Sequence, residues 1–218
     1  MKYVALLVLT ALILGLPTVN FQHHLNLPDI DKSRITSHHE VSFANRSVTI
    51  KKVTDIRLPS ILQGEDRVKD IMVVLADARP GDVINFHLAG YGGDGDAMFE
   101  IINGIHASKA TVNMIVESNV YSAHAYLATQ GNTLTMLPYT YMMFHTVSAY
   151  GVDCSQEQGL DRTVPNSEHC QAMLDAVMAE ANLLIANIPL LTLEEQQRIA
   201  TGHDVYITAA DYNSRKIK

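Results

Sequence analysis

Patterns typical of strands and helices alternate along the middle of this chain, and the alternation limits the folds open to it. Apolar residues at helical spacing follow Glu65 until Pro80 ends the pattern. A strand over 82–89 comes next, then a Gly-rich tight turn over 90–94 and a helix over 97–106. Strands separated by helices require crossover connections, so we expect an α/β fold with a largely parallel sheet.

The alternation continues to residue 146, after which helices dominate. Expected elements are a strand over 110–117, a helix over 122–131, and strands over 133–137 and 140–146. A long helix follows over 167–187. Two short helices are predicted from their capping signals, the first by Thr192 with Glu195 and the second by Thr208 with Asp211. The chain therefore has one α/β body with a helical C-terminal part.

The N-terminal residues have a pattern typical of an export signal. Lys2 precedes an apolar run over 3–16 that Pro17 closes, a length typical of a secretory signal and short for a bilayer span. We expect residues 1–20 to be a signal peptide or an N-terminal membrane anchor. We expect residues 21–40 to form a polar linker and residues 41–218 to form one domain. The domain would then be exported and would be periplasmic or extracellular. Any association with the membrane would be through residues 3–16.

Cysteine usage agrees with export. Cys154 and Cys170 bracket a polar stretch, and in an exported protein they predict a disulfide. Closing that loop would stabilise the fold by about 3 kcal/mol. A metal site is less favoured, because neither the cysteines nor the His pairs at 23–24 and 38–39 have a ligand frame. We expect no metal.

Composition and charge show that the chain can fold around a core and limit the kinds of molecule it can bind. Hydrophobic residues make up 47% of the 218 residues and charged residues 18%, so the chain can bury a core and is not of the disordered class. The net charge of −7 is spread along the chain, which argues against a basic face for nucleic acid.

Three residues occur in settings typical of a serine-hydrolase triad: Ser122 at a strand-to-helix junction, His145 at a strand end and Asp204 after a helix end. Each has an ordinary explanation, as a helix cap, a satisfied histidine or a turn residue. Together they favour catalysis, because a serine needs an imidazole to take its proton and a carboxylate to orient that imidazole. Gly93 and Ala123 would supply the backbone N–H groups of an oxyanion hole.

Four segments carry a family resemblance: Gly92-Gly93, 122–129, 143–146 and 204–208. In order and spacing they resemble the proteolytic subunit of the Clp protease (ClpP) family, within the ClpP/crotonase fold, over residues 48–213. The resemblance implies a spiral of β-α units with a protruding long helix, and no cofactor. It also implies a triad of Ser122, His145 and Asp204, an oxyanion hole from Gly93 and Ala123, and homo-oligomeric rings formed through the long helix.

The chain departs from the family pattern at several positions near the site. Tyr121 replaces an alanine before the serine, and His124 replaces a glycine two residues after it. Asp94 and Asp96 follow the Gly-Gly turn, where a carboxylate is unfavourable near a developing oxyanion unless it caps the helix. The segment 152–169 also differs from the family pattern. This difference affects the expected geometry of the oligomeric ring more than the expected chemistry of the site.

The leading hypothesis is an ATP-independent serine endopeptidase that acts on peptides or unfolded protein segments outside the cytoplasm. One alternative is a membrane protease resembling signal-peptide peptidases, with a dyad of Ser122 and Lys109. Another is a catalytically inactive ClpP/crotonase-fold subunit for binding or assembly. An α/β-hydrolase is less favoured, because the chain lacks a Gly-x-Ser-x-Gly elbow.

Overall fold

A computed structural model of the chain describes residues 18–23, 34–44, 47–63, 65–146 and 166–216. These fall into two compact units, Met1–Thr140 and Tyr141–Lys218. The expected signal or anchor run over 3–16 lies outside the described residues. So does the expected disulfide, because neither Cys154 nor the side chain of Cys170 is described.

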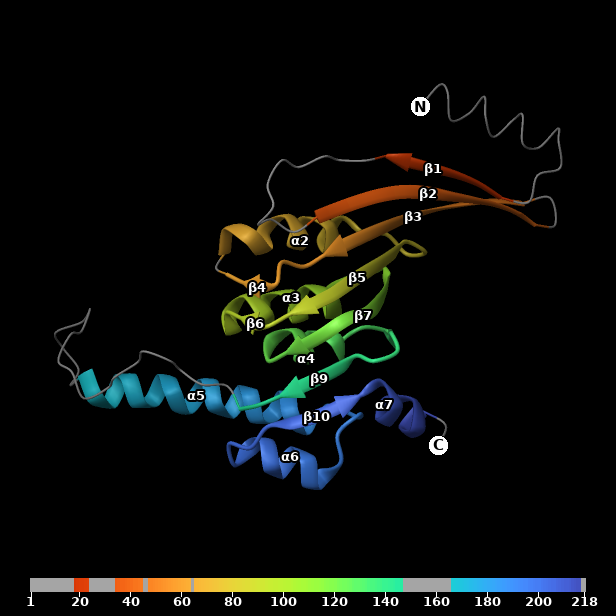
Figure 1. Cartoon of the computed structure of the whole chain (residues 1–218). Helices are drawn as coiled ribbons and strands as arrows, with labels where there is room; N and C mark the ends of the chain where they lie inside the picture. The colour runs from red at the N-terminus through yellow and green to blue at the C-terminus, as the bar shows by residue number, and fades with distance from the viewer. Residues whose placement is uncertain (1–17, 24–33, 45–46, 64, 147–165, 217–218) are drawn as a thin grey trace. The chain divides into compact units, whose positions relative to one another are not determined.

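A sheet with a parallel centre forms the first unit (Figure 1). Its strands neighbour one another in the order β1 (Thr18–His23), β2 (Arg34–Ala44), β3 (Ser47–Arg57), β5 (Val83–Gly90), β7 (Thr111–Tyr121) and β8 (Thr133–Met136). From β3 to β8 all pairs are parallel, as the crossover argument predicts. The pairs β1–β2 and β2–β3 are antiparallel. Only two residues separate β2 from β3, too few for a crossover.

Strands β1 and β2 occupy much of the segment expected to be a polar linker, 21–40. Ile35 and Val41 are buried on β2, whereas Arg34 and Ser42 are exposed. Only these two of its apolar side chains are described as buried, and they are six residues apart. Within 34–40, Ile35 is the one apolar residue, so this part of the strand has no apolar alternation that would distinguish it from a linker in the sequence.

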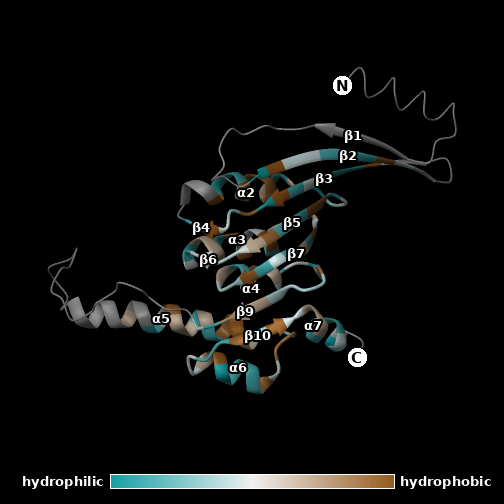
Figure 2. Cartoon of the chain, viewed as in Figure 1, coloured by the Kyte–Doolittle hydropathy of each residue, from teal (hydrophilic) through white to brown (hydrophobic). Residues whose placement is uncertain are grey.

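Three helices, α2 (Glu65–Asp77), α3 (Gly95–Ala107) and α4 (Ala123–Ala128), follow the parallel strands of unit one. They contribute apolar stripes to the core, visible as brown segments in Figure 2. The stripe of α2 is Val68, Ile71 and Leu75, as the helical spacing predicts. The strands bury Ile84, Phe86, Leu88, Val112, Met114 and Val116, one residue in two. Each such side chain stabilises the fold by about 1.5–3 kcal/mol.

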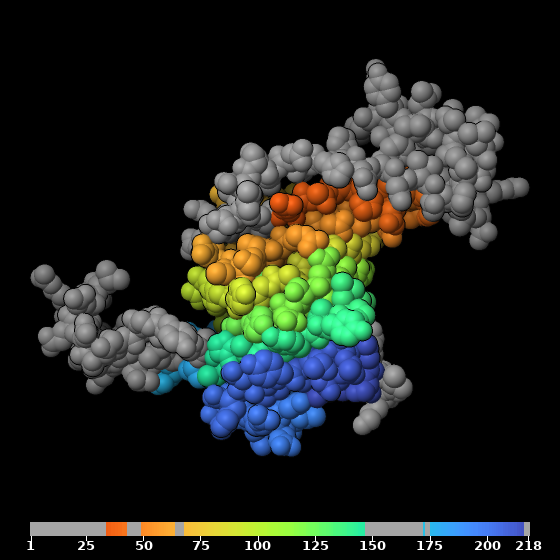
Figure 3. Space-filling view, in the orientation of Figure 1, coloured from red at the N-terminus to blue at the C-terminus, as the bar shows by residue number. Residues whose placement is uncertain are grey.

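The alternate side chains of the same strands form a polar row. Asn85 donates to the Asp55 carboxylate (2.8 Å), and Asn113 donates in turn to the Asn85 carbonyl oxygen (2.9 Å). Glu117 accepts from Arg57 and lies 2.7 Å from Nδ1 of His87. The hydrogen bond from Arg57 lowers the pKa of Glu117. In Figure 3 these strands appear as successive bands from orange to green.

A short antiparallel ladder and three helices make up the described part of unit two. Strands β9 (Tyr141–Phe144) and β10 (Val205–Thr208) pair antiparallel. The helices are α5 (Asn166–Ala186), α6 (Leu193–Ala200) and α7 (Ala209–Lys216). Both capping predictions are confirmed, since Thr192 and Glu195 form a capping box and Asp211 accepts from the backbone and hydroxyl of Thr208. No helix among the described residues is long and apolar enough to cross a membrane.

Candidate active site

Ser122 occupies a strained turn between β7 and α4. Its φ of 53° and ψ of −127° lie where residues with side chains are rarely found. Such a conformation costs of the order of 1–3 kcal/mol and is typical of functional sites. The Ser122 side chain makes no capping hydrogen bond, so the ordinary explanation as a side-chain cap is wrong. Its carbonyl oxygen instead accepts from Ala125 (2.8 Å) and Tyr126 (3.1 Å).

An irregularity in the sheet directs the chain into this turn. Leu88 pairs with Val116, but Gly90 pairs with Val120, so two steps along β5 correspond to four along β7. A bulge of this kind bends the strand and redirects the residues that follow it. The extra residues lie between Val116 and Val120, and the chain then enters the segment Tyr121, Ser122 and Ala123, which we call the Ser122 turn.

Two residues of the Gly-rich segment form a short strand, whereas the whole segment was expected to be a tight turn. β6 (Gly92–Gly93) pairs parallel with β4 (Ile61–Leu62). A Cβ on Gly92 would lie 2.7 Å from the Cβ of Ser122 and 2.8 Å from the backbone nitrogen of Ala123. No real Cβ tolerates such contacts, and the φ of 94° also favours glycine. The structure thus brings β6 against the Ser122 turn.

The two glycines have different neighbours. Gly93, the residue expected to donate to an oxyanion, has a φ of 128°, and a Cβ there would collide with the carbonyl oxygen of Leu62. Gly93 is exposed, whereas Gly92 is buried. Gly92 therefore allows β6 to approach Ser122, and Gly93 allows β6 to approach β4. The sequence alone did not separate these roles.

Asp94 caps a helix, which is the condition under which a carboxylate is tolerated close to the expected oxyanion hole. Its side chain accepts a hydrogen bond from the backbone nitrogen of Ala97 at 3.0 Å and so caps α3. Its own backbone N–H donates to the carbonyl of Leu62 at 3.1 Å. The negative charge is therefore directed at the positive end of a 13-residue helix.

His124, seen in the sequence only as a departure from the family, is a buried structural contact. Its side chain is fully buried, with Nε2 3.0 Å from the carbonyl oxygen of Pro59. Burial lowers the pKa of His124 to about 4, while the Pro59 contact opposes the shift. The ring is therefore neutral at pH 7, and Nε2–H is the donor. Its Nδ1 is buried and has no hydrogen-bond partner among the described residues.

An aromatic pair flanks the turn. The rings of Tyr91 and Tyr121 stack, with centroids 5.5 Å apart and planes at 22°. Each tyrosine directly precedes a residue of the site, Gly92 and Ser122 respectively. Tyr91 is 69% exposed, so one ring of the pair is open to solvent. Sequence reasoning noted Tyr121 as a departure and missed its partner.

His145 and Asp204 belong to unit two and lie at one end of its ladder. The last pair of that ladder is Val205 with Phe144. In the antiparallel register, the next residues outward on the two strands are Asp204 and His145. His145 is half-buried and Asp204 is exposed. Residues opposite each other in such a ladder are close enough for side-chain contact.

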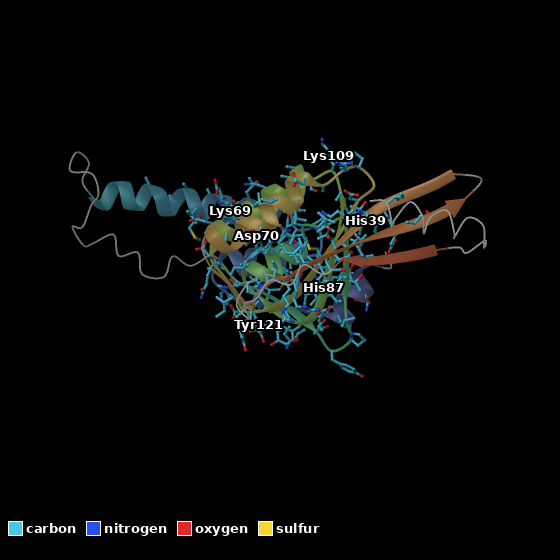
Figure 4. The ribbon with its side chains drawn as sticks, turned by 90° about the horizontal axis from the view of Figure 1, so that it is seen from above. His39, Lys69, Asp70, His87, Lys109 and Tyr121 are labelled. Carbon is cyan, nitrogen blue, oxygen red and sulfur yellow. The ribbon has the colours of Figure 1, made fainter. Side chains whose placement is uncertain are left out.

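Lys109, the alternative partner of Ser122, lies at the wrong end of β7. It precedes the first residue of the strand, whereas Ser122 follows the last. Because β7 has 11 residues, its two ends are roughly 30 Å apart. Figure 4 shows Lys109 and Tyr121 at opposite ends of the labelled region. No group of three or more metal-ligating side chains occurs within the described ranges.

A family model described as Clp protease matches residues 47–187, more than half of the chain. The matched range contains Gly93, Ser122, Ala123 and His145 and ends before Asp204. No curated protein matches the chain. The mixed α/β architecture is that of the ClpP/crotonase fold, which the sequence led us to expect.

Proposed function

The chain belongs to the Clp protease family, and from this premise we propose that it is an ATP-independent serine endopeptidase acting on peptides or unfolded protein segments. The observation that carries the proposal is the strained Ser122, with β6 packed directly against it. A side chain held at positive φ at a strand-to-helix junction is the arrangement by which other hydrolases expose a nucleophile.

In the proposed mechanism, the Oγ atom of Ser122 attacks the carbonyl carbon of the scissile peptide bond. His145 takes the serine proton and passes it to the leaving amine, while Asp204 holds the imidazole in the required tautomer. Water then attacks the acyl-enzyme with His145 as base, which releases the acid product and restores the serine. The register of β9 and β10 supports the assignment of Asp204 as partner of His145.

The tetrahedral intermediate carries a negatively charged oxygen, which hydrogen-bond donors must stabilise. We assign this role to the backbone N–H groups of Ala123 and Gly93. A donor of this kind contributes about 3 kcal/mol to transition-state stabilisation in comparable hydrolases. The approach of β6 to Ala123 supports the assignment, because a Cβ at Gly92 would lie 2.8 Å from the Ala123 nitrogen.

The cellular setting belongs to the same proposal. The apolar run over 3–16 favours a periplasmic or extracellular enzyme, where ATP-driven unfolding is not at hand. The substrate would then be a peptide or an already unfolded segment. Members of this family typically assemble into oligomers, so we propose a homo-oligomer as the working form.

An inactive subunit for binding or assembly is the second candidate. The replacements at Tyr121 and His124 favour it, because both flank the serine. The strain at Ser122 favours catalysis, since a purely structural turn would gain stability from a glycine at that position. The dyad with Lys109 receives no support, given its place at the far end of β7.

Labelling with a fluorophosphonate probe tests the proposal. We expect one adduct, mapped by mass spectrometry to Ser122, and no adduct in Ser122→Ala. Ser118→Ala is the matched control, because Ser118 is an exposed serine on the same strand. The absence of both labelling and peptide cleavage in the wild-type oligomer would favour the inactive subunit instead.

A further inference from the structure

We propose that His124 is a positioning residue, which keeps β6 at its working distance from Ser122 by holding the segment 59–62. The inference rests on the proposed peptidase function and adds no new reacting group. It concerns how the oxyanion donors are held, and it is carried by a closed series of contacts within unit one.

The first contact joins α4 to the segment 59–62. Nε2 of His124 lies 3.0 Å from the carbonyl oxygen of Pro59, and the imidazole is fully buried. His124 is only two residues from Ser122, so the contact starts at the Ser122 turn itself. Pro59 has no backbone N–H, which leaves its carbonyl as its only polar backbone group.

The second group of contacts joins the segment 59–62 to β6. Tyr91 donates its backbone N–H to Ser60 at 2.7 Å, and Asp94 donates to Leu62 at 3.1 Å. Between these two bonds, β4 and β6 pair in parallel register. The backbone also fits closely, because a Cβ on Gly90 would collide with the carbonyl oxygen of Ser60. The position of β6 is therefore set by the segment that His124 holds.

The last contact returns to the serine. The backbone at Gly92 packs against the Ser122 turn, with 2.7 Å from a Cβ position at Gly92 to the carbonyl oxygen of Tyr121. The series thus runs from Ser122 through His124, Pro59, β4 and β6 back to Ser122. Without the His124 hydrogen bond, the segment 59–62 would no longer hold β6 in place against the Ser122 turn. Displacements of about 1 Å in such settings lower turnover by about 100-fold.

The chemistry of the contact explains the choice of side chain. A buried carbonyl needs a donor, and a neutral imidazole supplies one without adding charge. Glutamine is the conservative substitute, because its Nε2 donor lies the same number of bonds from Cβ as Nε2 of histidine. Leucine has a comparable size and no donor. These two substitutions separate the hydrogen bond from the packing.

The experiment compares His124→Gln and His124→Leu with the wild-type oligomer, measuring kcat and KM on a fluorogenic peptide together with amide hydrogen exchange. We expect H124L to lower kcat 10- to 100-fold with KM little changed, and the Tyr91 and Asp94 amides to exchange at least tenfold faster. H124Q should keep kcat within a few fold. The Asn132 amide, which donates to Val112 at 2.7 Å, should not change in either variant.

Leu127→Val is the matched control, because Leu127 is buried on the same helix and does not belong to this series. The inference is wrong if H124L keeps wild-type kcat and exchange, if H124Q fails as completely as H124L, or if L127V lowers kcat equally. Should H124L not fold, nitrogen NMR of the wild-type histidine decides, since a proton on Nδ1 instead of Nε2 would contradict the contact. If the wild type neither cleaves nor labels, the peptidase proposal fails, while the exchange rates still test the positioning role.

Discussion

The backbone of Gly92 lies close against the side chain of Ser122, because a Cβ on Gly92 would lie 2.7 Å from the Cβ of Ser122. The serine directly follows the last residue of β7, and the glycine belongs to β6, thirty residues earlier in the chain. Their contact places a strand with little side-chain bulk beside the only described serine with positive φ. The first prediction concerns this contact.

Gly92→Ala should reduce both stability and activity. The alanine would be strained at a φ of 94° and would also collide with the Ser122 turn. We expect unfolding to become easier by about 3 kcal/mol or more, and labelling of Ser122 to become at least 100-fold slower. Gly81→Ala is the control, because Gly81 has the same φ of 94° but nothing within 4 Å of its Cβ position. That variant should lose only about 1 kcal/mol in denaturant unfolding. Equal losses in the two variants would contradict the contact.

Ser122→Gly should be more stable than Ser122→Ala, although both lack the hydroxyl. Alanine keeps a Cβ at a φ of 53°, whereas glycine adopts that conformation without strain. We expect a difference of about 1 kcal/mol in the free energy of unfolding, measured in urea. If S122G were the less stable of the two, the turn would not be strained. A positive difference would show that a Cβ at this position costs stability.

Much of the fold was predictable because its signals are local. The stripe of Val68, Ile71 and Leu75 identifies α2, and the pair Thr192 and Glu195 identifies the start of α6. The core strands show their alternation in the sequence, as at Ile84, Phe86 and Leu88. Such features depend on residues within one or two turns of each other.

The site was less predictable because its geometry depends on distant pairing. A two-residue strand such as β4 has no periodicity, so its pairing with β6 leaves no pattern in the sequence. The bulge before Ser122 arises from the register between β5 and β7, which no single segment records. His124 was noticed as an unusual residue, but its partner Pro59 lies 65 positions away. These pairings join segments that are distant in the sequence, so no local pattern records them.

The buried His124 should make stability depend on pH between about 4 and 6.5. In the folded protein burial lowers its pKa to about 4 from the ordinary 6.5, so the unfolded chain takes up the proton first as pH falls. Stability is therefore full above pH 6.5 and is lost as pH falls toward 4, by up to about 3 kcal/mol. Urea unfolding at several pH values should show this slope in the wild type, and a flatter profile in His124→Gln. Parallel profiles would mean that the imidazole is not buried as a neutral group.

The pair Glu195 and Arg215 should stabilise unit two down to low pH. Two hydrogen bonds of 2.8 Å join the guanidinium to the carboxylate, and Arg215 also donates to Leu190 at 2.8 Å. The Arg215 hydrogen bonds and those of Thr192 lower the pKa of Glu195 to about 2 from 4.5. This stability is present above pH 4.5 and is lost as pH falls through 2.

Arg215→Lys tests the geometry of the pair. Lysine keeps the charge but cannot form two parallel hydrogen bonds, so the Glu195 pKa should move upward toward 4.5 in carboxyl NMR titrations. We expect a loss of about 1 kcal/mol at pH 7, because the pair is partly exposed. An unchanged Glu195 pKa in R215K would indicate that Thr192 alone holds the carboxylate.

The proposed triad predicts a specific pattern of double-mutant effects. If Asp204 acts only by orienting His145, Asp204→Asn should lower kcat by up to about 10⁴-fold, and His145→Ala should lower it at least as far. The double variant should then be no slower than H145A alone, because a residue that acts through another has no effect once that residue is gone. Single-turnover cleavage of a fluorogenic peptide measures all three rates. Asp211→Asn is the control, since Asp211 is an aspartate of the same unit whose carboxylate is bonded to Thr208. Fully multiplicative losses from D204N and H145A would show that the two residues act independently, and the assignment of Asp204 would be withdrawn.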